Sequence, residues 1–228
     1  MVTAVIVAAG RGTRMGSGMD KIFLEIAGRP VVLHTWLTFD SCPQIDHIVL
    51  VIRKECLPMF ENMGRGCSLT KPHTFVVGGA ERQDSVWNGL NSMPSTTEIV
   101  AIQDAARPCT THDIIRRTIE SARESGAAVA ASLITDTIKE SRDGRTISRH
   151  LDRANLRAVQ TPQTFRVDVI RRAILSAREN NMLFTDDTAA CEAIGHPVQL
   201  VVSSEPNPKV TVPADLPQIE QLLSPKVK

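Results

Sequence analysis

The chain has 228 residues, enough to fill one core well or two small ones. Its 26 lysine and arginine residues nearly balance 25 aspartate and glutamate residues, so no global positive field exists to bind a nucleic-acid backbone or an anionic membrane. No apolar run reaches the roughly 20 residues of a membrane span, and the strand expected at residue 2 leaves no room for a targeting segment. We therefore expect a cytoplasmic protein that recognises anions only locally.

The cysteines and histidines give no sign of a metal site. The five cysteines form no Cys-x-x-Cys pair and are odd in number, which argues against a disulfide framework and against bound zinc. The six histidines include no i, i+4 pair of the kind that binds metal on a helix. We expect reduced thiols and no metal ligands from protein side chains.

Short apolar runs alternate with amphipathic segments along the chain. Buried strands are predicted at residues 2–8, 47–52, 73–77, 98–102, 127–132 and 198–202. Helices are predicted at residues 30–39, 82–93, 111–125, 167–180, 186–194 and 214–223. Pro30 suits the first turn of its helix and Thr111 the N-cap of another, whereas Pro58 leaves residues 53–71 ambiguous.

This alternation predicts an α/β fold in which a mostly parallel sheet carries helices on both faces. The stretch TIKESRDGRTISRHLDR, residues 137–153, differs because it is polar and roughly alternating. Asp143-Gly144 is a strong hairpin signal in its middle. We expect one domain over residues 1–228, with a protruding β-hairpin arm at about 137–157.

The stretch VIVAAGRGTRMGSGMDK, residues 5–21, leads from the first predicted strand into a glycine loop, residues 9–20. The dinucleotide fingerprint needs glycine where Met15 stands, and the GxxxxGK[ST] phosphate loop fails because isoleucine follows Lys21. Glycine still lets backbone amides close around an anion, and Arg11, Arg14 and Lys21 add full positive charge. This pattern favours a polyphosphate site over its alternative, a flexible surface loop with solvated cations.

Two other segments are expected at the same edge of the sheet, where ligands bind in open α/β sheets. Gly78-Gly79 and residues 103–108 each follow a predicted strand, and Asp104 is placed to reach a hydroxyl group or a hydrated metal ion. Alternatively, Asp104 caps a turn or helix. Lys209, late in the chain, is an ordinary solvated lysine unless other site residues accompany it.

Further short motifs occur in order along the chain. They are AAGRGTRM (8–15), Lys21, GGAERQDSV (78–86), DAARP (104–108), DT (136–137), LDR (151–153), QTPQTF (160–165), TDD (185–187) and PKVT (208–211). Many nucleotidyltransferases share the first motif, but the ordered set is specific. From about residue 4 to 216, the chain resembles the 2-C-methyl-D-erythritol 4-phosphate cytidylyltransferase family.

The resemblance implies a Rossmann-like sheet of the nucleotidyltransferase type that binds CTP over the glycine loop, with Mg²⁺ held chiefly by the CTP phosphates. It also implies a homodimer in which each β-arm completes the site of the other subunit. The implied reaction joins CTP and methylerythritol 4-phosphate to give 4-diphosphocytidyl-2-C-methyl-D-erythritol and pyrophosphate in the non-mevalonate isoprenoid pathway. Because the attacking phosphate is already ionised, preorganised cations and Mg²⁺ do most of the catalysis.

Residue roles follow from the same resemblance. The implied catalytic cations are Arg14 and Lys21 at the triphosphate and Lys209 at the attacking phosphate. Arg153 of the partner subunit is implied to join Lys209 there. The implied substrate-binding residues are Asp104, Arg107 and Thr161 of the same chain, together with Thr137 of the partner subunit. The implied nucleotide-binding residues are Ala8, Ala9, Gly10, Gly12, Gly78, Gly79, Ala80, Ser85 and Ala105.

The chain departs from the family pattern at three places. The family usually reads Pro-Lys-Gln where this chain has Asp20-Lys21-Ile22, so a carboxylate stands beside a catalytic cation. Arg157 replaces a common tryptophan, and Val212 replaces a common arginine. None of the four key cations is lost.

Two other functions fit part of the sequence. A ribitol 5-phosphate cytidylyltransferase shares the glycine loop, the DAARP-like segment and the Thr-Pro-Gln motif, but LDR ahead of NLRAVQTPQ favours methylerythritol phosphate. Asp20 and Ile22 suggest a protein that binds CTP without turning it over, although all four cations are present. Met15 and the lack of a ribose-binding acid after the second strand exclude a dehydrogenase.

Overall fold

The computed structural model describes residues 1–10 and 20–224. The strands are β1 (Val2–Val7), β2 (Glu25–Ile26), β3 (Arg29–Pro30), β4 (His47–Ile52), β5 (His73–Val77), β6 (Ile99–Asp104), β7 (Ala127–Leu133), β8 (Ile138–Glu140), β9 (Arg149–Leu151), β10 (Arg157–Arg166) and β11 (Gln199–Val202). The helices are α1 (Val31–Ser41), α2 (Leu57–Arg65), α3 (Arg82–Asn91), α4 (His112–Ser125), α5 (Val167–Glu179), α6 (Asp187–Ala193) and α7 (Leu216–Leu223).

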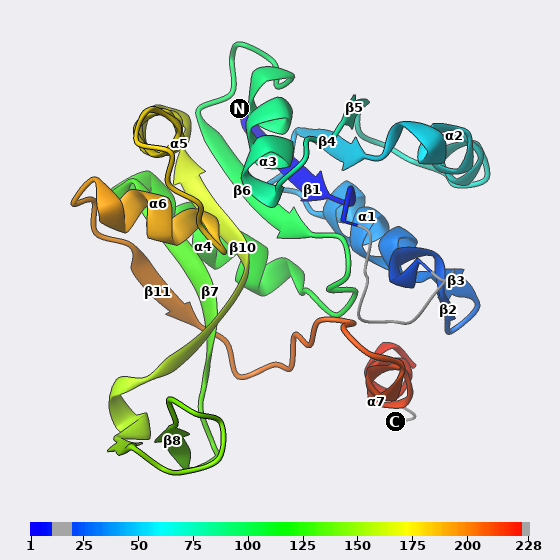
Figure 1. Ribbon diagram of the computed structural model, residues 1–228. Helices are drawn as coiled ribbons and strands as arrows, with labels where there is room; N and C mark the ends of the chain where they lie inside the picture. The colour runs from blue at the N-terminus through cyan, green and yellow to red at the C-terminus, as the bar shows by residue number, and fades with distance from the viewer. Residues whose placement is uncertain (11–19, 225–228) are drawn as a thin grey trace.

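A seven-stranded sheet forms the centre of the molecule, in the order β11-β7-β10-β6-β1-β4-β5 (Figure 1). The pairs β6–β1, β1–β4, β4–β5 and β7–β11 are parallel, whereas β10 runs antiparallel to both of its neighbours. Continuous apolar sequence explains the central strands: every residue of HIVLVI in β4 is buried.

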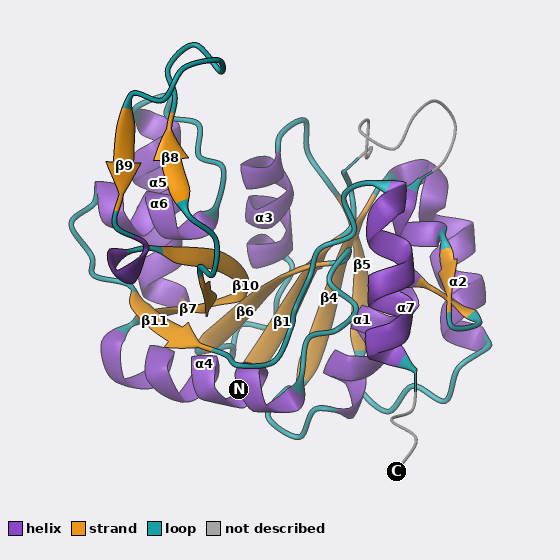
Figure 2. Ribbon diagram, turned by 90° about the horizontal axis from the view of Figure 1, so that it is seen from below, coloured by secondary structure: helices purple, strands orange, loops and turns teal. Residues whose placement is uncertain are grey.

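Helices cover both faces of the sheet (Figure 2). Alternate side chains of β4 point to opposite faces: Ile48 and Leu50 belong to the core shared with α1, α2 and α4, whereas Val49 and Val51 belong to the core shared with α3, α5 and α6. The predicted α/β fold, with a mostly parallel sheet between two helical layers, is confirmed. Among the described residues, no helix has both the length and the apolar character that a membrane crossing requires.

Helix α2 lies within the ambiguous stretch 53–71. Pro58 sits in its first turn, where the missing N–H removes no helical hydrogen bond, and not in its interior. Phe60 is fully buried, with its ring centroid 5.6 Å from that of Phe23 and 6.2 Å from that of Phe75. The proline therefore marks the start of the helix, and Phe60 anchors it to the core.

Strand β10 was not predicted from the sequence. Its sequence, RAVQTPQTFR, has a proline in the middle, which argues against a central strand. Pairing with β7 stops at Val159 and resumes at Gln163, and pairing with β6 begins only at Gln163. Pro162 therefore lies in a bulge, where it interrupts neither ladder. The bulge sets Thr161 beside the end of β6, where its Oγ1 accepts the N–H of Asp104 at 3.1 Å.

The predicted β-arm is a hairpin of β8 and β9 that projects away from the sheet (Figure 2). Ile138 pairs with Leu151 at its base. The connection spans residues 141–148, so Asp143-Gly144 lies in a longer loop and not in a two-residue turn. Asp143 accepts backbone N–H groups within this loop, and Gly144 has a φ of 68°, which favours glycine.

Candidate active site

A cavity opens at the carboxyl edge of the sheet, beside the ends of β1 and β6. Lys21, from the turn after the glycine loop, and Lys209, from the segment after β11, both line it. The predicted nucleotide-binding residues that line it are Ala8, Ala9, Gly10, Gly79, Ala80, Ser85 and Ala105. Gly78 lines the neighbouring hollow with Gly10 and Gly79. Two predicted catalytic cations and most of the predicted nucleotide-binding residues are thus brought together.

A second cavity adjoins the first. Arg82, Asp104 and Lys209 line both cavities. Arg107 and Thr161, both predicted to bind the substrate, line the second. The two cavities therefore meet at one group of charged side chains.

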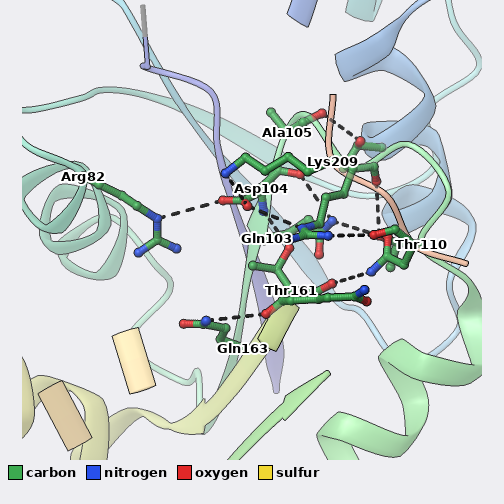
Figure 3. Close-up of polar contacts among 12 residues, drawn as sticks. Arg82, Gln103, Asp104, Ala105, Thr110, Thr161, Gln163 and Lys209 are labelled. Atoms are coloured by element: carbon green, nitrogen blue, oxygen red, sulfur yellow. Dashed lines mark hydrogen bonds and ion pairs between the residues drawn. The ribbon is translucent and has the colours of Figure 1, made fainter. Parts of the chain in front are cut away.

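Three cations surround Asp104, the last residue of β6, and Figure 3 labels two of them, Arg82 and Lys209. Lys209 Nζ lies 2.8 Å and Arg107 Nε 3.5 Å from its Oδ2, and Arg82 Nε lies 3.9 Å from its Oδ1. Burial favours the neutral acid, but the positive charges of Lys209 and Arg82 outweigh this effect and lower the pKa of Asp104 below its ordinary value. Asp104 is therefore ionised at neutral pH.

Replacing Asp104 with asparagine is expected to lower the free energy of unfolding by about 3–5 kcal/mol at neutral pH, because it removes the carboxylate from a largely buried cluster of cations. The pKa of Asp104 is depressed in the folded state, so its stabilisation is complete above the unfolded pKa near 3.8 and is lost as the pH falls through the folded pKa. Urea unfolding between pH 3 and 7 should show the difference between wild type and variant shrinking below about pH 4.

The matched control is Asp168→Asn, which removes a carboxylate that is 70% exposed and 3.6 Å from Arg166 Nε. An exposed pair of this kind contributes little, so stability should barely change at any pH. If Asp104→Asn behaved in the same way as this control, Asp104 would not be the electrostatic centre of the cluster.

Arg82, the first residue of α3, connects Asp104 to a second carboxylate. Its Nη2 donates to Oδ2 of Asp187 at 2.8 Å, and the Asp187 side chain is 3% exposed. Burial favours the neutral form of Arg82, but Asp187 and Asp104 reverse this effect and raise its pKa, so the guanidinium stays charged. Neither Arg82 nor Asp187 was predicted as a site residue. The sequence signal that could have identified them was their place in two of the family motifs, Arg82 in GGAERQDSV and Asp187 in TDD.

Asn207 anchors the segment that carries Lys209, and it too was not predicted as a site residue. Its side-chain amide donates to the carbonyl of Thr161 at 2.8 Å, and its Oδ1 accepts the hydroxyl of Thr110 at 3.0 Å. Its own carbonyl accepts Arg107 Nη1 at 2.6 Å. Because Asn207 is buried, these bonds fix the chain two residues before Lys209.

Gly78 and Gly79, directly after β5, leave no space for side chains. A Cβ at Gly78 would lie 2.4 Å from Ala9 Cβ and 2.8 Å from Ser85 Oγ, and one at Gly79 would lie 2.3 Å from Asp84 Cβ. The N–H of Gly79 also donates to Ser85 Oγ at 3.1 Å. The two glycines therefore let the connection to α3 pass directly against the end of β1.

The remaining predicted site residues lie elsewhere. Among the described residues of one chain, Thr137 and Arg153 lie on the exposed arm and line neither cavity. Arg153 Nη1 donates to the carbonyl of Thr135 in its own chain. Arg14 and Gly12 lie outside the described residues. Within one chain, Lys21 and Lys209 thus line the same cavity, whereas Arg153 does not line it.

The charged cluster does not fit a protein-bound metal ion. Within residues 1–10 and 20–224, no group of three or more histidine, cysteine, aspartate or glutamate side chains is placed to hold one. Both carboxylate oxygens of Asp104 already face cations, namely Lys209, Arg107 and Arg82. A divalent ion needs several free oxygen ligands, and this arrangement does not supply them.

The sequence signature of the IspD family, 2-C-methyl-D-erythritol 4-phosphate cytidylyltransferase, matches residues 2–224. The chain belongs to this family. A cytidylyltransferase of the same name from Bacillus cereus is 39% identical over 98% of both chains. Another, from Syntrophus aciditrophicus, is 40% identical over 97% of this chain and 95% of its own. The predicted enzyme class, a nucleotidyltransferase, is confirmed.

Solved structures of IspD proteins share this fold. The 4-diphosphocytidyl-2C-methyl-D-erythritol synthase of Anaerococcus prevotii superimposes with a TM-score of 0.86 at 26% identity, covering 97% of this chain and 95% of its own. The cytidylyltransferase of Thermus thermophilus gives 0.76 at 30% identity, covering 96% of each chain. Membership of the IspD family confirms the function predicted from the sequence, a methylerythritol phosphate cytidylyltransferase of the non-mevalonate isoprenoid pathway.

Proposed function

We propose that the protein transfers the cytidylyl group of CTP to the phosphate of 2-C-methyl-D-erythritol 4-phosphate in the two adjoining cavities. The observation that carries this proposal is that both cavities share Arg82, Asp104 and Lys209. CTP occupies the cavity lined by Lys21 and the nucleotide-binding residues, and the alcohol phosphate occupies the second. The two reacting phosphates then meet at the shared cations.

The reaction forms a bond between a phosphate oxygen of the alcohol phosphate and the α-phosphorus of CTP. The bond from that phosphorus to the leaving pyrophosphate breaks. Because the attacking oxygen is already ionised, repulsion between anions is the main barrier, and Lys21, Arg14 and Lys209 lower it. An ammonium has three donors, so Lys209 can bind the attacking phosphate without leaving Asp104.

Asp104, Arg107 and Thr161 are proposed to bind the alcohol. The ionised carboxylate of Asp104 accepts hydroxyl groups of the erythritol chain, and Arg107 lines the same cavity. Thr161 is 3% exposed, and its hydroxyl oxygen accepts a hydrogen bond from the N–H of Asp104. Its hydroxyl hydrogen therefore points away from that N–H. These contacts select a polyhydroxy phosphate, with Asp104 nearest the shared cations.

The active site is proposed to be completed by the arm of a second subunit. Thr137 and Arg153 are exposed on a hairpin that projects away from the sheet (Figure 2). In a homodimer formed through the arms, Thr137 of the partner subunit reaches the hydroxyl groups and Arg153 of the partner subunit reaches the attacking phosphate. This arrangement accounts for both residues lying outside the cavities of their own chain.

Mg²⁺ is proposed to enter with the nucleotide, because the described side chains do not form a site of their own for it. Bound to the triphosphate, the ion neutralises part of the negative charge. Lys21 and Lys209 add positive charge from the protein itself. The residues around Asp104 then act on the alcohol phosphate and not on the metal.

The protein is proposed to work in the cytoplasm. All five cysteines are free thiols. Burial raises the pKa of Cys109 to about 11, which keeps its thiol protonated and unreactive. Free thiols suit a reducing compartment.

Replacing Gly78 with alanine is expected to raise the KM for CTP at least about tenfold, because the new Cβ pushes Ala9 and Ser85 out of position. Steady-state kinetics with CTP as the varied substrate checks this. In the control, Gly66→Ala, the new Cβ lies 3.5 Å from the carbonyl oxygen of Asn62, which is ordinary contact. An unchanged KM for CTP in the Gly78 variant would show that these residues do not bind the nucleotide.

Pyrophosphate release tests the proposed function. The protein is incubated with Mg²⁺, CTP and either methylerythritol 4-phosphate or ribitol 5-phosphate, and rapid release is expected only with the first alcohol. A preference for ribitol 5-phosphate would overturn the substrate assignment. Binding of CTP without release from either alcohol would favour the non-catalytic alternative. ATP, GTP and UTP in place of CTP measure selectivity for the base.

A further inference from the structure

Arg53 follows the last residue of β4 and contacts both ends of the glycine loop. Its Nη1 donates to the carbonyl of Gly10 at 3.1 Å, and its Nη2 donates to a carboxylate oxygen of Asp20. Gly10 and Asp20 are the described residues on either side of positions 11–19. One guanidinium therefore joins the residue before this segment to the residue after it.

Asp20 uses its two carboxylate oxygens differently. Oδ1 accepts the N–H of Ile22 at 3.4 Å and caps the short turn Lys21–Phe23, whereas Oδ2 accepts from Arg53. The side chains of Asp20 and Arg53 are 15% and 16% exposed, so water screens their charges poorly. Burial favours the neutral form of Arg53, but the hydrogen bond to Asp20 reverses this effect and raises its pKa. Asp20 and Arg53 thus form a mostly buried ion pair.

The position of Asp20 makes this pairing important for the site. Asp20 is the neighbour in sequence of Lys21, which lines the nucleotide cavity. An uncompensated carboxylate there would repel a triphosphate and offset the charge of the lysine. Among the described residues, Arg53 lines the neighbouring hollow beside Gly10 and Gly79 and does not line this cavity. Its hydrogen bonds to Asp20 and Gly10 connect it to the cavity.

We propose that Arg53 is a positioning residue for CTP binding, which pairs with Asp20 so that this carboxylate does not oppose the charge that Lys21 presents to the triphosphate. By binding Gly10 as well, the same side chain fixes the last described residue before positions 11–19. The inference rests on the proposed function, since it requires CTP in the cavity lined by Lys21. It adds a residue that no sequence motif indicated.

A double-mutant cycle tests the inference, with Arg53→Ala, Asp20→Asn and the double variant assayed for turnover and, by calorimetry, for binding of CTP with Mg²⁺. Arg53→Ala leaves the Asp20 carboxylate uncompensated, so the KM and Kd for CTP should rise about tenfold. The KM for methylerythritol 4-phosphate should change less than about twofold. In the double variant the uncompensated charge is gone, and the Kd for CTP should return to within about threefold of wild type.

Two further variants sharpen the test. Arg53→Lys keeps the charge but has no fork to reach Gly10 and Asp20 together, so it should give a smaller rise in Kd than alanine. Arg53→Gln, which also removes the charge, replaces alanine in the cycle if Arg53→Ala fails to fold. Arg65→Ala removes an exposed cation of α2 that donates to Asn62, and it should leave both KM values unchanged.

The possible outcomes separate this inference from the proposed function. If wild type turns over CTP but Arg53→Ala raises both KM values equally, or if Asp20→Asn restores nothing in the Arg53→Ala background, Arg53 is only structural and the inference is wrong. If wild type neither binds nor turns over CTP, the proposed function fails and the inference fails with it. A selective rise in the Kd for CTP that Asp20→Asn reverses supports both.

Discussion

Replacing Lys21 with alanine is expected to slow the chemical step on the order of 10²-fold or more while leaving the fold intact. The lysine is the first residue of a turn that Asp20 caps and that Ile22, 3% exposed, anchors in the core. Because both anchors remain, we expect the turn to keep its place while the preorganised charge proposed to act at the triphosphate is lost. Single-turnover kinetics with saturating CTP measures the step, and thermal unfolding checks the fold.

The control for Lys21→Ala is again Arg65→Ala, which removes one positive charge from the exposed surface of α2. If turnover depended only on the net charge of the protein, the two variants would be equally slow. We expect Arg65→Ala to keep wild-type turnover. Normal single-turnover kinetics in Lys21→Ala would remove this residue from the mechanism.

The edge of the sheet that carries the site was predictable because its signals are local in sequence. Apolar runs identified the ends of β1, β5 and β6, and in an open α/β sheet these ends lie together. The positions of the predicted strands alone therefore placed Asp104 and the pair Gly78-Gly79 at the edge of the sheet where the cavity opens. Lys209 is different, since only the family motif singled it out, and its place at the site depends on the buried Asn207.

The rest of the site depends on partners that are distant in sequence. Arg82 binds Asp187, 105 positions away, and no periodicity in either helix indicates this pair. Arg53 and Asp20 are 33 positions apart. From the sequence, the carboxylate of Asp20 seemed to weaken the neighbouring lysine, because its partner was not visible.

Strand β10 shows why propensity arguments fail at this site. A proline normally excludes a central strand, and here Pro162 lies with Gln160 and Thr161 in a bulge that pairs with neither neighbour. The same bulge carries Thr161 to the backbone N–H of Asp104. The local irregularity that hid the strand is therefore what places Thr161, a proposed substrate-binding residue, beside Asp104.

The arm separates the proposed catalytic cations into two groups. Lys21 and Lys209 line the nucleotide cavity, whereas Arg153 is exposed on the hairpin of the same chain. If each site takes Arg153 from the partner subunit, Arg153→Ala should raise the KM for methylerythritol 4-phosphate far more than that for CTP. Equal effects on both substrates would contradict its assignment to the attacking phosphate.

Exchange of arms predicts that two defective variants rescue each other. In an equal mixture of Lys21→Ala and Arg153→Ala subunits, about half of the dimers are mixed, and one of the two sites in each mixed dimer has both cations intact. Activity should therefore rise to about a quarter of wild type after subunit exchange, far above either variant alone. In the control, Lys21→Ala mixed with the Lys21→Ala/Arg153→Ala double variant, no intact site can form. If each site used its own arm, every site in the first mixture would keep one defect, and mixing would restore nothing.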